Sequence, residues 1–171
     1  IDAGRGNSPN AQWNGTGGIV TSDTRAVNQN DLTTLGVATG AQVKGLPLNA
    51  TALWNGQTVT ATDVLVMFTW GGDANLDGKI NIDDYGQIDF NVGSSGSVFG
   101  WYNGDFNYDG KINIDDYGII DFNVSAQTGA FPTGGGIEGA AAVPEPVELV
   151  LLTLAPLLRR RRSRQSRGRP A

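Results

Sequence analysis

Residues 72–92 read GDANLDGKINIDDYGQIDFNV, and residues 104–124 repeat this stretch almost unchanged as GDFNYDGKINIDDYGIIDFNV. The two copies lie 32 residues apart. They differ at three of their 21 positions, which are Ala74/Phe106, Leu76/Tyr108 and Gln87/Ile119. Self-similarity of this length at a fixed offset indicates a duplicated structural unit.

Each copy opens with the pattern Asp-x-Asn-x-Asp-Gly, which places oxygen-bearing side chains at alternate positions of a tight loop. Calcium loops take oxygens from positions 1, 3, 5, 9 and 12 and a backbone carbonyl from position 7, with Gly at position 6. The residues at these ligand positions are Asp73, Asn75, Asp77, Lys79, Asn81 and Asp84 in the first copy, and Asp105, Asn107, Asp109, Lys111, Asn113 and Asp116 in the second. The sequence therefore predicts two metal sites. It favours Ca²⁺ over Mg²⁺ because Ca²⁺ accepts six to eight oxygens in flexible geometry.

Two positions within the loops refine this prediction. Position 12 is Asp84 or Asp116, where loops of this kind usually carry Glu, so the shorter side chain must bring its helix closer to the metal. Position 8 is Ile80 or Ile112, and we expect both to point away from the metal and to pack the two loops together. A cluster of solvated Asx turns is the alternative for a single loop. Two complete copies favour metal binding.

Each loop leads into a predicted helix. Asn81 and Asn113 stand at N-cap positions, three residues before an Asp that completes a capping box, so helices are expected near 82–91 and 114–123. The side chains expected to face inward are Tyr85, Ile88, Phe90, Tyr117, Ile120 and Phe122. Gly86 and Gly118 fall inside the helices at a cost of about 1 kcal/mol each relative to Ala. We therefore expect the helices to approach closely at these glycines, related by a pseudo-twofold axis.

The segments before the loops, Thr69-Trp70-Gly71-Gly72 and Trp101-Tyr102-Asn103-Gly104, are aromatic and turn-like, so no helix is expected to enter either loop. Two such loop–helix units in tandem resemble the type I dockerin module, over about residues 69–125. The resemblance implies a non-catalytic docking function with a cohesin-like protein domain as partner. It also implies recognition through the helix starts, Ile82-Asp83 and Ile114-Asp115, whose identity in both copies allows two binding modes related by a half-turn.

Residues 1–70 read as a β-rich segment. The clearest strand signal is the run 57–70, which follows a turn at Asn55-Gly56. It alternates at first and then becomes a β-branched and aromatic run, 64–70, that is typical of a well-buried strand. We expect this strand to bury one face of a small sheet or to offer an edge to a partner. Weaker strand candidates are 19–21, 35–38 and Val43, and 31–35 is a candidate helical turn. The stretches 35–38 and 63–73 resemble the β-rich segment that precedes dockerin-like repeats in large planctomycete secreted proteins. We therefore expect this chain to be the C-terminal part of such a protein.

Composition excludes several kinds of chemistry. The chain contains no Cys and no His, which rules out thiol and imidazole nucleophiles, the usual zinc sites and disulfides. Seven of its 12 basic residues are arginines within 159–169, so residues 1–158 carry a net charge of −12 and the tail carries +7. Ten of the 17 acidic residues lie between Asp73 and Asp121, so Ca²⁺ is expected to be a folding partner. Nucleic acid is not expected as a partner, because the acidic body repels phosphate.

The C-terminal part divides into a predicted linker, 126–142, and a tail, 143–171. The tail contains Val143-Pro144-Glu145-Pro146, the apolar stretch 147–158 and the run Arg159-Arg160-Arg161-Arg162. This order resembles the PEP-CTERM sorting signal. The resemblance implies an envelope sorting protease as a partner, transient membrane contact through 143–162 with the arginines inside, and a secreted or cell-envelope location. The apolar stretch is 12 residues against the roughly 20 that a span needs, and a disordered basic tail is the alternative.

The expected fold class is mixed: a small β-rich N-terminal segment (1–70), a dockerin-like α module of two loop–helix, EF-hand-like calcium repeats (71–125), and a disordered or hydrophobic tail. The expected function is a non-catalytic calcium-binding module that mediates docking or assembly. One alternative is a Ca²⁺-rigidified structural end of a surface or adhesin-like protein. Another is the tail of a polysaccharide-degrading enzyme whose catalytic domain lies upstream. The sequence contains no recognisable catalytic constellation, because its carboxylates are concentrated in the loops.

Overall fold

A computed structural model describes residues 1–6, 13–27 and 31–133, which make up most of the unit Ile1–Gly136. The sorting-signal prediction (143–171) and most of the predicted linker (126–142) lie outside the described residues. The elements in chain order are α1 (Asp2–Arg5), α2 (Thr24–Val27), β1 (Thr33–Thr39), α3 (Gly40–Lys44), β2 (Thr51–Trp54), β3 (Gln57–Thr60), β4 (Val64–Trp70), α4 (Ile82–Asn91), η1 (Val92–Ser94), η2 (Trp101–Asn103) and α5 (Ile114–Ala126).

Two antiparallel pairs of strands make up the β structure. β1 pairs with β4 along its whole length, from Thr33 opposite Trp70 to Thr39 opposite Val64, and β2 pairs with β3 as a hairpin. The strand signal of 57–70 is thus two strands, and the run 64–70, predicted as a well-buried strand, is β4 with the same bounds. The two strands are separated by a turn in which the Asp63 carboxylate accepts the amide of Thr60 at 2.7 Å. The turn residues 60–63 are polar except for Ala61, so the break coincides with the end of the alternating part of the pattern.

Three weaker predictions for the N-terminal part were wrong. Residues 33–35 begin β1 instead of forming a helical turn, because their amides and carbonyls pair with the end of β4. Val43 lies in α3, whose N-cap Thr39 forms a capping box with Gln42. Residues 19–21 form no strand. In the first two cases local propensity was overridden by a pairing or a cap that the single stretch does not reveal.

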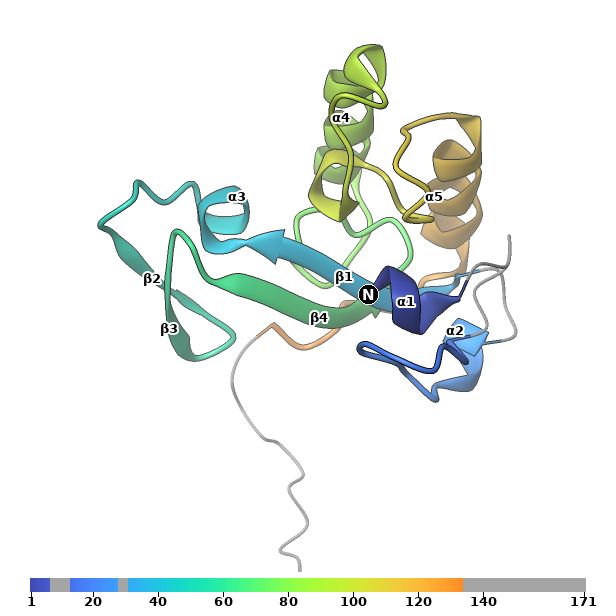
Figure 1. Cartoon of the computed structure of the whole chain (residues 1–171), viewed down its shortest axis with the longest axis horizontal. Coiled ribbons are helices and arrows are strands. Elements are labelled where there is room, and N and C mark those ends of the chain that lie inside the picture. The colour runs from blue at the N-terminus through green and yellow to red at the C-terminus, as the bar shows by residue number, and fades with distance from the viewer. Residues whose placement is uncertain (7–12, 28–30, 134–171) are drawn as a thin grey trace, which may run out of the picture. The chain divides into compact units, whose positions relative to one another are not determined.

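The two repeats each form a loop followed by a helix, and the helix starts are confirmed. α4 begins at Ile82 after the N-cap Asn81, and α5 begins at Ile114 after Asn113, with a complete capping box at each start. α4 ends at Asn91 as predicted, whereas α5 continues to Ala126, three residues beyond the prediction. Both helices lie on the same side of the β1–β4 ribbon (Figure 1).

Reciprocal contacts relate the repeats by a pseudo-twofold axis. The Tyr85 hydroxyl donates to Asp121 at 2.6 Å, and the Tyr117 hydroxyl donates to Asp89 at the same distance. The close approach, however, is not at the helix glycines. A Cβ at Gly86 or Gly118 would meet nothing within 4 Å, whereas one at Gly72 would lie 2.9 Å from Ile120 and one at Gly104 would lie 2.6 Å from Ile88. The glycine just before each loop therefore admits the helix of the other repeat.

The inward face of the helices is narrower than predicted. Ile88 and Ile120 are fully buried and Tyr85 and Tyr117 are half-buried, as expected. Phe90 and Phe122 were also predicted to face inward, but they are 86% and 53% exposed. Their position two residues after the buried isoleucines carries them around the helix onto its outer surface.

The repeats and the β ribbon share one core. The Trp101 indole donates to the carbonyl of Asp73 at 2.7 Å, and the Tyr108 hydroxyl donates to the carbonyl of Leu35 on β1 at 2.6 Å. The Asn123 amide donates to the carbonyls of Asp31 and Gly71, both at 2.9 Å. Buried residues of β1, β4, both loops and both helices belong to one hydrophobic cluster.

The predicted fold class, a β-rich N-terminal segment followed by a dockerin-like α module of two EF-hand-like calcium repeats, is wrong. The described residues form a mixed α/β structure of five α-helices and two small antiparallel sheets, and three of the helices precede residue 70. Within residues 1–6, 13–27 and 31–133, no group of three or more His, Cys, Asp or Glu side chains is placed to hold a metal ion. The prediction rested on short sequence patterns. It therefore did not reveal the contacts between distant residues that join the β1–β4 ribbon to α4 and α5.

Candidate metal centre

We call residues 73–84 loop 1 and residues 105–116 loop 2. The side chain of Asp73, the first residue of loop 1, lies at the centre of that loop. Asp73 is buried, and its carboxylate accepts the amide of Asp77 at 3.1 Å and that of Gly78 at 2.9 Å. The Thr69 hydroxyl, at the end of β4, donates to the same carboxylate. Gly78 has φ of +88°, a conformation that glycine adopts without strain, so the chain turns sharply enough for these bonds to form.

Asp84, the last residue of loop 1, both closes the loop and caps the start of α4. One oxygen of Asp84 accepts the amides of Ala74 at 2.9 Å and Asn75 at 3.3 Å, and the other accepts the amide of Asn81 at 2.8 Å. The buried Asp84 carboxylate therefore joins the start of the loop to the first turn of α4. A carboxylate there also interacts favourably with the helix dipole.

Loop 2 repeats this arrangement almost bond for bond. Asp105 accepts the amides of Asp109 at 3.1 Å and Gly110 at 3.2 Å. Asp116 accepts the amides of Phe106 at 2.7 Å, Asn107 at 3.3 Å and Asn113 at 2.9 Å. Where loop 1 has the Thr69 hydroxyl, loop 2 has the amide of Gly100, which donates to Asp105 at 3.1 Å.

The remaining predicted ligands have defined roles of their own. The side-chain oxygens of Asn75 and Asn107 accept the amides of Asp77 and Asp109, both at 2.9 Å. The side-chain oxygens of Asn81 and Asn113 accept the amides of Asp83 and Asp115, both at 2.7 Å, as N-caps. The carboxylates of Asp77 and Asp109 accept the amides of Lys79 at 3.1 Å and Lys111 at 2.9 Å.

Burial makes the loop carboxylates unusual acids. It raises the pKa of Asp73 to about 6, against the bonds from Thr69 and the loop amides. It raises the pKa of Asp84 to about 7, with further increases from the charges of Asp73 and Asp77. In loop 2, burial raises the pKa of Asp116 to about 6 and also raises the pKa of Asp105. All four carboxyl groups are thus less acidic than an Asp in water.

Little positive charge in the described residues offsets these buried carboxylates. Within the described ranges, the only ion pair that touches a loop is Lys79 with Asp77, at 3.8 Å between largely exposed groups. Asp73, Asp84, Asp105 and Asp116 are therefore buried with amide and hydroxyl donors but with no basic partner among the described residues. Buried anions without a counter-charge are costly, and oxygen-rich loops of this kind suit a hard divalent cation.

The fit to a cation does not depend on carboxylates alone. No three acidic side chains converge on a metal position in the described part of the chain. In the described arrangement, a cation in loop 1 could be held by at most two of the carboxylates of Asp73, Asp77 and Asp84, together with the amide oxygen of Asn75 and the carbonyl of Lys79. The buried and uncompensated carboxylates are the observation that favours this fit.

Sequence reasoning missed the residues that hold the loops from outside. The Gln127 side chain forms two bonds with the backbone of Ile80, at 2.9 Å to its amide and 2.8 Å to its carbonyl, and the amide of Phe131 donates to Gly78 at 2.7 Å. We call residues 127–131 the strap. On loop 2, the Ser95 hydroxyl accepts the amide of Ile112 at 2.7 Å. No local pattern marks these residues, because their partners lie far away in the sequence.

The predicted packing of position 8 is confirmed only in part. Ile80 and Ile112 are both buried in the shared core. Their amides, however, bond to Gln127 and Ser95 and not to the opposite loop. The loops are therefore joined through the core and the helices.

The helices in the described part of the chain are too short or too polar to cross a membrane. Comparison of the chain with protein-family models, with curated proteins and with solved structures found no match.

Proposed function

We propose that this chain is a non-catalytic module that binds two Ca²⁺ ions, one in each loop, and that docks a partner on a secreted or cell-envelope protein. The observation that supports the proposal most is the set of four buried carboxylates without a basic partner in the described residues. The matched bonding of the two loops supports equivalent roles for them.

Within this proposal each residue has a definite task. Asp73, Asn75 and Asp77 bind the ion from one side of loop 1, and Asp84 binds it from the start of α4. Loop 2 uses the corresponding residues. Bound Ca²⁺ supplies the positive charge that offsets the buried carboxylates. Amides of the loop already bond to Asp73 and Asp84, and binding would draw the carboxylates closer together, because no three of them converge on a metal position in the described residues.

Calorimetric titration of the full chain with Ca²⁺ tests the metal part of the proposal. We expect two sites with dissociation constants of about 10⁻⁴–10⁻³ M, as for extracellular modules. Ligand at 100 times the dissociation constant adds about 2.7 kcal/mol per site, so a chelator should lower the melting temperature. Titration with Mg²⁺ is the control. A melt that is the same in Ca²⁺ and in chelator would contradict the proposal.

The docking part of the proposal is supported by the helix starts. Ile82 and Ile114 are 79% and 78% exposed, and each is followed by an exposed Asp. By the resemblance described above, the partner is a cohesin-like domain. An immobilised cohesin domain should retain the full chain, and an Ile82→Ala/Ile114→Ala variant should not be retained. Val64→Ala, which changes an exposed apolar residue on β4, is the matched control.

A structural role is the second candidate, and the shared core favours it. Loop 2 is bonded to β1 through Tyr108, and Trp101 of η2 is bonded to loop 1, so order in the loops extends to the strands. Hydrogen exchange separates the two candidates. If Ca²⁺ slows exchange of the amides of β1 and β4, and no cohesin domain binds, the module stiffens the end of a larger protein instead of docking a partner.

The sorting prediction for the tail stays part of the proposal. It is supported by the order of motifs in 143–162 and not by any described residue. Mass spectrometry of the protein recovered outside its source cell tests it. The mature chain should lack Arg169, Pro170 and Ala171, and their presence on that material would contradict sorting with cleavage.

A further inference from the structure

A groove runs along α4, between that helix, loop 1 and η2. It has a volume of about 780 Å³ and is lined by side chains from all three segments. A volume of this size is in the range of ligand sites in proteins. The lining residues on α4 extend from Ile82 to Asn91, so about 14 Å of helix borders the groove. The groove is therefore long enough for an extended ligand.

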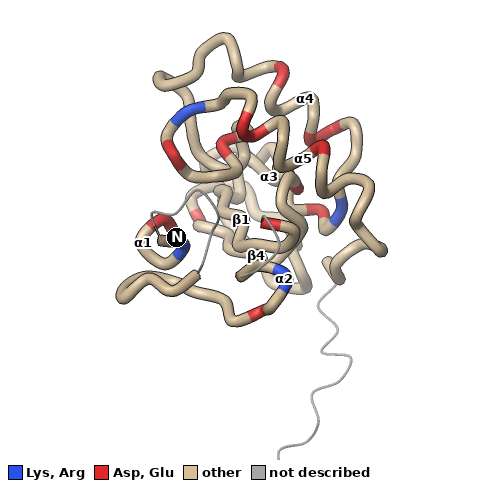
Figure 2. Tube along the Cα trace, turned by 90° about the vertical axis from the view of Figure 1, so that its right-hand side faces the viewer, with Lys and Arg blue, Asp and Glu red and all other residues tan. Residues whose placement is uncertain are grey.

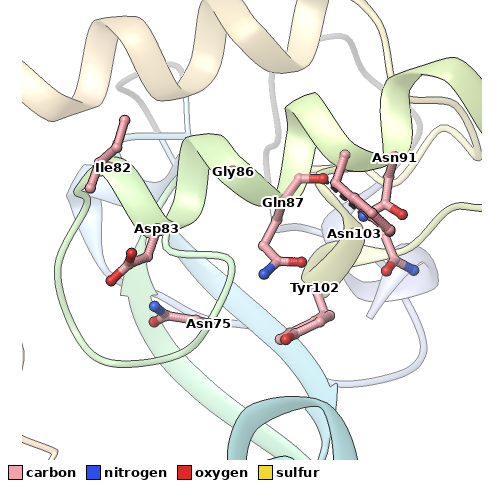
Figure 3. A pocket seen from close by; sticks show the side chains of 9 residues that line it. Asn75, Ile82, Asp83, Gly86, Gln87, Asn91, Tyr102 and Asn103 are labelled. Carbon is pink, nitrogen blue, oxygen red and sulfur yellow. Dashed lines mark hydrogen bonds between the residues drawn. The ribbon is translucent and has the colours of Figure 1, made fainter.

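Most of the side chains that line the groove are polar. The uncharged ones are four amides and a phenol, which are Asn75, Gln87, Asn91, Asn103 and Tyr102. Figure 3 shows the Gln87 side chain extending from α4 into the space between Asn75 of loop 1 and Tyr102 of η2. Asp83 is the charged side chain among the described residues that line the groove, and no Lys or Arg is among them. The lining is therefore built for hydrogen bonding and not for ion pairing.

These side chains keep hydrogen-bonding groups that the fold does not use. The Asn75 side-chain oxygen accepts a loop amide at 2.9 Å, which leaves its nitrogen as a donor. The side-chain nitrogens of Asn91 and Asn103 each donate to a backbone carbonyl at 2.8 Å, which leaves their oxygens as acceptors. The Gln87 side-chain amide and the Tyr102 hydroxyl form no hydrogen bond with another described residue. Hydroxyl groups both donate and accept, so a ligand rich in hydroxyls matches this mixture.

Two aromatic rings border the same groove. Phe90 is 86% exposed and Tyr102 is half-buried. The face of an aromatic ring carries partial negative charge and is apolar, so it attracts C–H groups that carry partial positive charge. A pyranose sugar has hydroxyls around its rim and C–H groups on its faces. It therefore matches the amides and the rings of this groove at the same time.

The charge around the groove disfavours anionic ligands. Residues 72–124 contain ten Asp and two Lys, a net charge of −8, and neither α4 nor α5 carries a basic residue. Figure 2 shows the acidic positions along both helices and the loops before them. Two bound Ca²⁺ ions would leave the repeats at −4, so the surface stays acidic in either state. Phosphate, sulfate and uronate groups are therefore repelled, whereas a neutral ligand is not.

The polar lining is particular to the first repeat. Equivalent positions of the two repeats, 32 residues apart, are Tyr102/Trp70, Asn103/Gly71 and Gln87/Ile119. Trp70 is buried in the core, and Ile119 packs against it. The second repeat therefore has apolar residues or glycine where the first has a phenol and two amides. The groove is thus not a by-product of the repeated sequence.

We propose that this groove binds a neutral oligosaccharide, with sugar hydroxyls on the amides and a C–H face of a pyranose ring on an aromatic side chain. The site goes beyond the proposed function, which assigns no such ligand. The groove includes Ile82 and Asp83, one of the two helix starts assigned to a protein partner, so sugar and partner compete there. The other helix start, Ile114-Asp115, does not line the groove and stays open to the partner.

Chemical-shift titration of the full chain in Ca²⁺ tests the site. The probes are cellotriose, maltotriose and triacetylchitotriose, which are neutral and differ in linkage or substituents. A few hydrogen bonds and one ring contact correspond to a dissociation constant on the order of 1 mM. At about 20 times that concentration, at least one probe should shift the amides of Gly86 and Gln87 to saturation and leave those of β2 and β3 in place. If none of the three shifts the groove amides, the inference is overturned.

Two control ligands test the two sides of the chemistry. Sorbitol has the hydroxyls of a sugar but no rigid face of C–H groups, so it should shift the groove amides far less. Trigalacturonic acid is a trisaccharide with a carboxylate on every ring, so the acidic surface should repel it. Shifts from sorbitol as large as those from the neutral trisaccharides, or tighter binding of trigalacturonic acid, would overturn the inference.

Matched variants place the site on α4. Gln87→Ile introduces the side chain of the equivalent position in the second repeat and should weaken binding of the active probe about fivefold or more, because hydrogen bonds are lost. Phe90→Ala should also weaken it, whereas Phe122→Ala, at the equivalent exposed position of α5, should not. The amide spectrum shows directly whether each variant is folded. Equal losses in the two Phe variants would contradict a site on α4.

An added cohesin domain distinguishes this inference from the proposed function. If a sugar probe shifts the groove amides and no cohesin domain is retained, the sugar site is supported and the docking proposal fails. If a cohesin domain shifts the groove amides and no sugar probe does, the groove belongs to the protein partner and the sugar inference is overturned.

Discussion

The two loops share almost the same sequence, but they are held in place differently. Leu76 and Tyr108 occupy equivalent positions with φ of 57° and 60°, and the N-caps Asn81 and Asn113 have φ of −151° and −152°. The conformation is therefore set locally, by side chains bonding to nearby amides. The surroundings are not equivalent. Loop 1 is crossed by the strap, whereas the Ser95 hydroxyl is the outside side chain bonded to loop 2 among the described residues.

The sequence differences between the copies follow the same asymmetry. Phe106 packs against Trp101 with ring centroids 4.9 Å apart, where loop 1 has the small Ala74. Tyr108 reaches β1 with its hydroxyl, whereas Leu76, its counterpart, lies under Gly36. The two repeats contact different parts of the same β1–β4 ribbon, so they need different side chains at these contacts. Two of the three exchanged positions, Ala74/Phe106 and Leu76/Tyr108, therefore supply contacts with β1 or η2.

Removal of the first loop residue should have the largest effect. Asp73→Ala leaves the buried amide of Gly78 and the Thr69 hydroxyl without an acceptor, at about 1–3 kcal/mol each, and removes a calcium site, whereas the amide of Asp77 keeps its bond to Asn75. We expect a loss of about 5 kcal/mol in Ca²⁺, with one site remaining by calorimetry and weakened through the shared core. Asp105→Ala should cost less, because the strap is not attached to loop 2. Asp2→Asn is the control. Equal losses of stability in Asp73→Ala and Asp105→Ala would contradict the proposed difference between the two loops.

The pH dependence of the metal-free chain should be the next largest effect. The pKa of Asp84 is raised to about 7 and those of Asp73 and Asp116 to about 6, above the ordinary 3.8, so the folded state binds these protons more tightly than the unfolded state. In chelator, stability should therefore rise by about 3 kcal/mol as the pH falls from 8 to 5. In Ca²⁺ the trend should reverse, because the ion requires the ionised carboxylates.

Denaturant unfolding at several pH values measures this effect. Carboxyl ¹³C titration of the metal-free chain then assigns it to the loops, and the highest midpoint should belong to Asp84 in loop 1. If the metal-free chain instead loses stability as the pH is lowered from 8 to 5, then burial does not destabilise the ionised form of these carboxyl groups. The argument for a bound cation would then be lost.

Matched glycine substitutions should have a smaller and unequal effect. Gly78 and Gly110 have φ of 88° and 82°, so an Ala at either position costs about 1–2 kcal/mol in backbone strain. A Cβ at Gly78 would also lie 2.4 Å from the carbonyl of Phe131, whereas one at Gly110 meets nothing within 4 Å. Gly78→Ala should therefore lower the melting temperature further than Gly110→Ala. Equal shifts of the melting temperature would show that the strap moves away from a Cβ at position 78 with no loss of stability.

The smallest effects should come from the outer contacts. Gln127→Ala removes two hydrogen bonds to loop 1 and Ser95→Ala removes one to loop 2, so we expect losses of about 2 and about 1 kcal/mol. Under the proposed function, chelator-triggered Ca²⁺ release should show two phases. Gln127→Ala should accelerate one and Ser95→Ala the other. Ser97→Ala serves as a neighbouring control, and acceleration of the same phase by both variants would contradict separate clamping.

The features that could be predicted from sequence are those determined by residues within about a dozen positions of one another. The loop turns and the starts of α4 and α5 were predicted correctly, because a capping Asn and an Asp three residues later act on adjacent amides. The exposure of Phe90 and the open space at Gly86 were not, because they depend on how α4 is rotated against its neighbours. The partners of Gln127 were also not predictable, since they lie 47 residues away.

The strap also determines how the folded unit bears mechanical load. Tension applied to the chain beyond residue 133 acts first on the Phe131–Gly78 bond, then on the bond from the Trp70 indole to the Gly129 carbonyl, and then on the two Gln127–Ile80 bonds. Three of these four bonds end on loop 1 and the other on β4, although α5 and loop 2 are closer to the point of pulling along the chain. A pull from the C-terminal side therefore opens the first loop while the second is still held by its own bonds, and the module yields at one end in a fixed order.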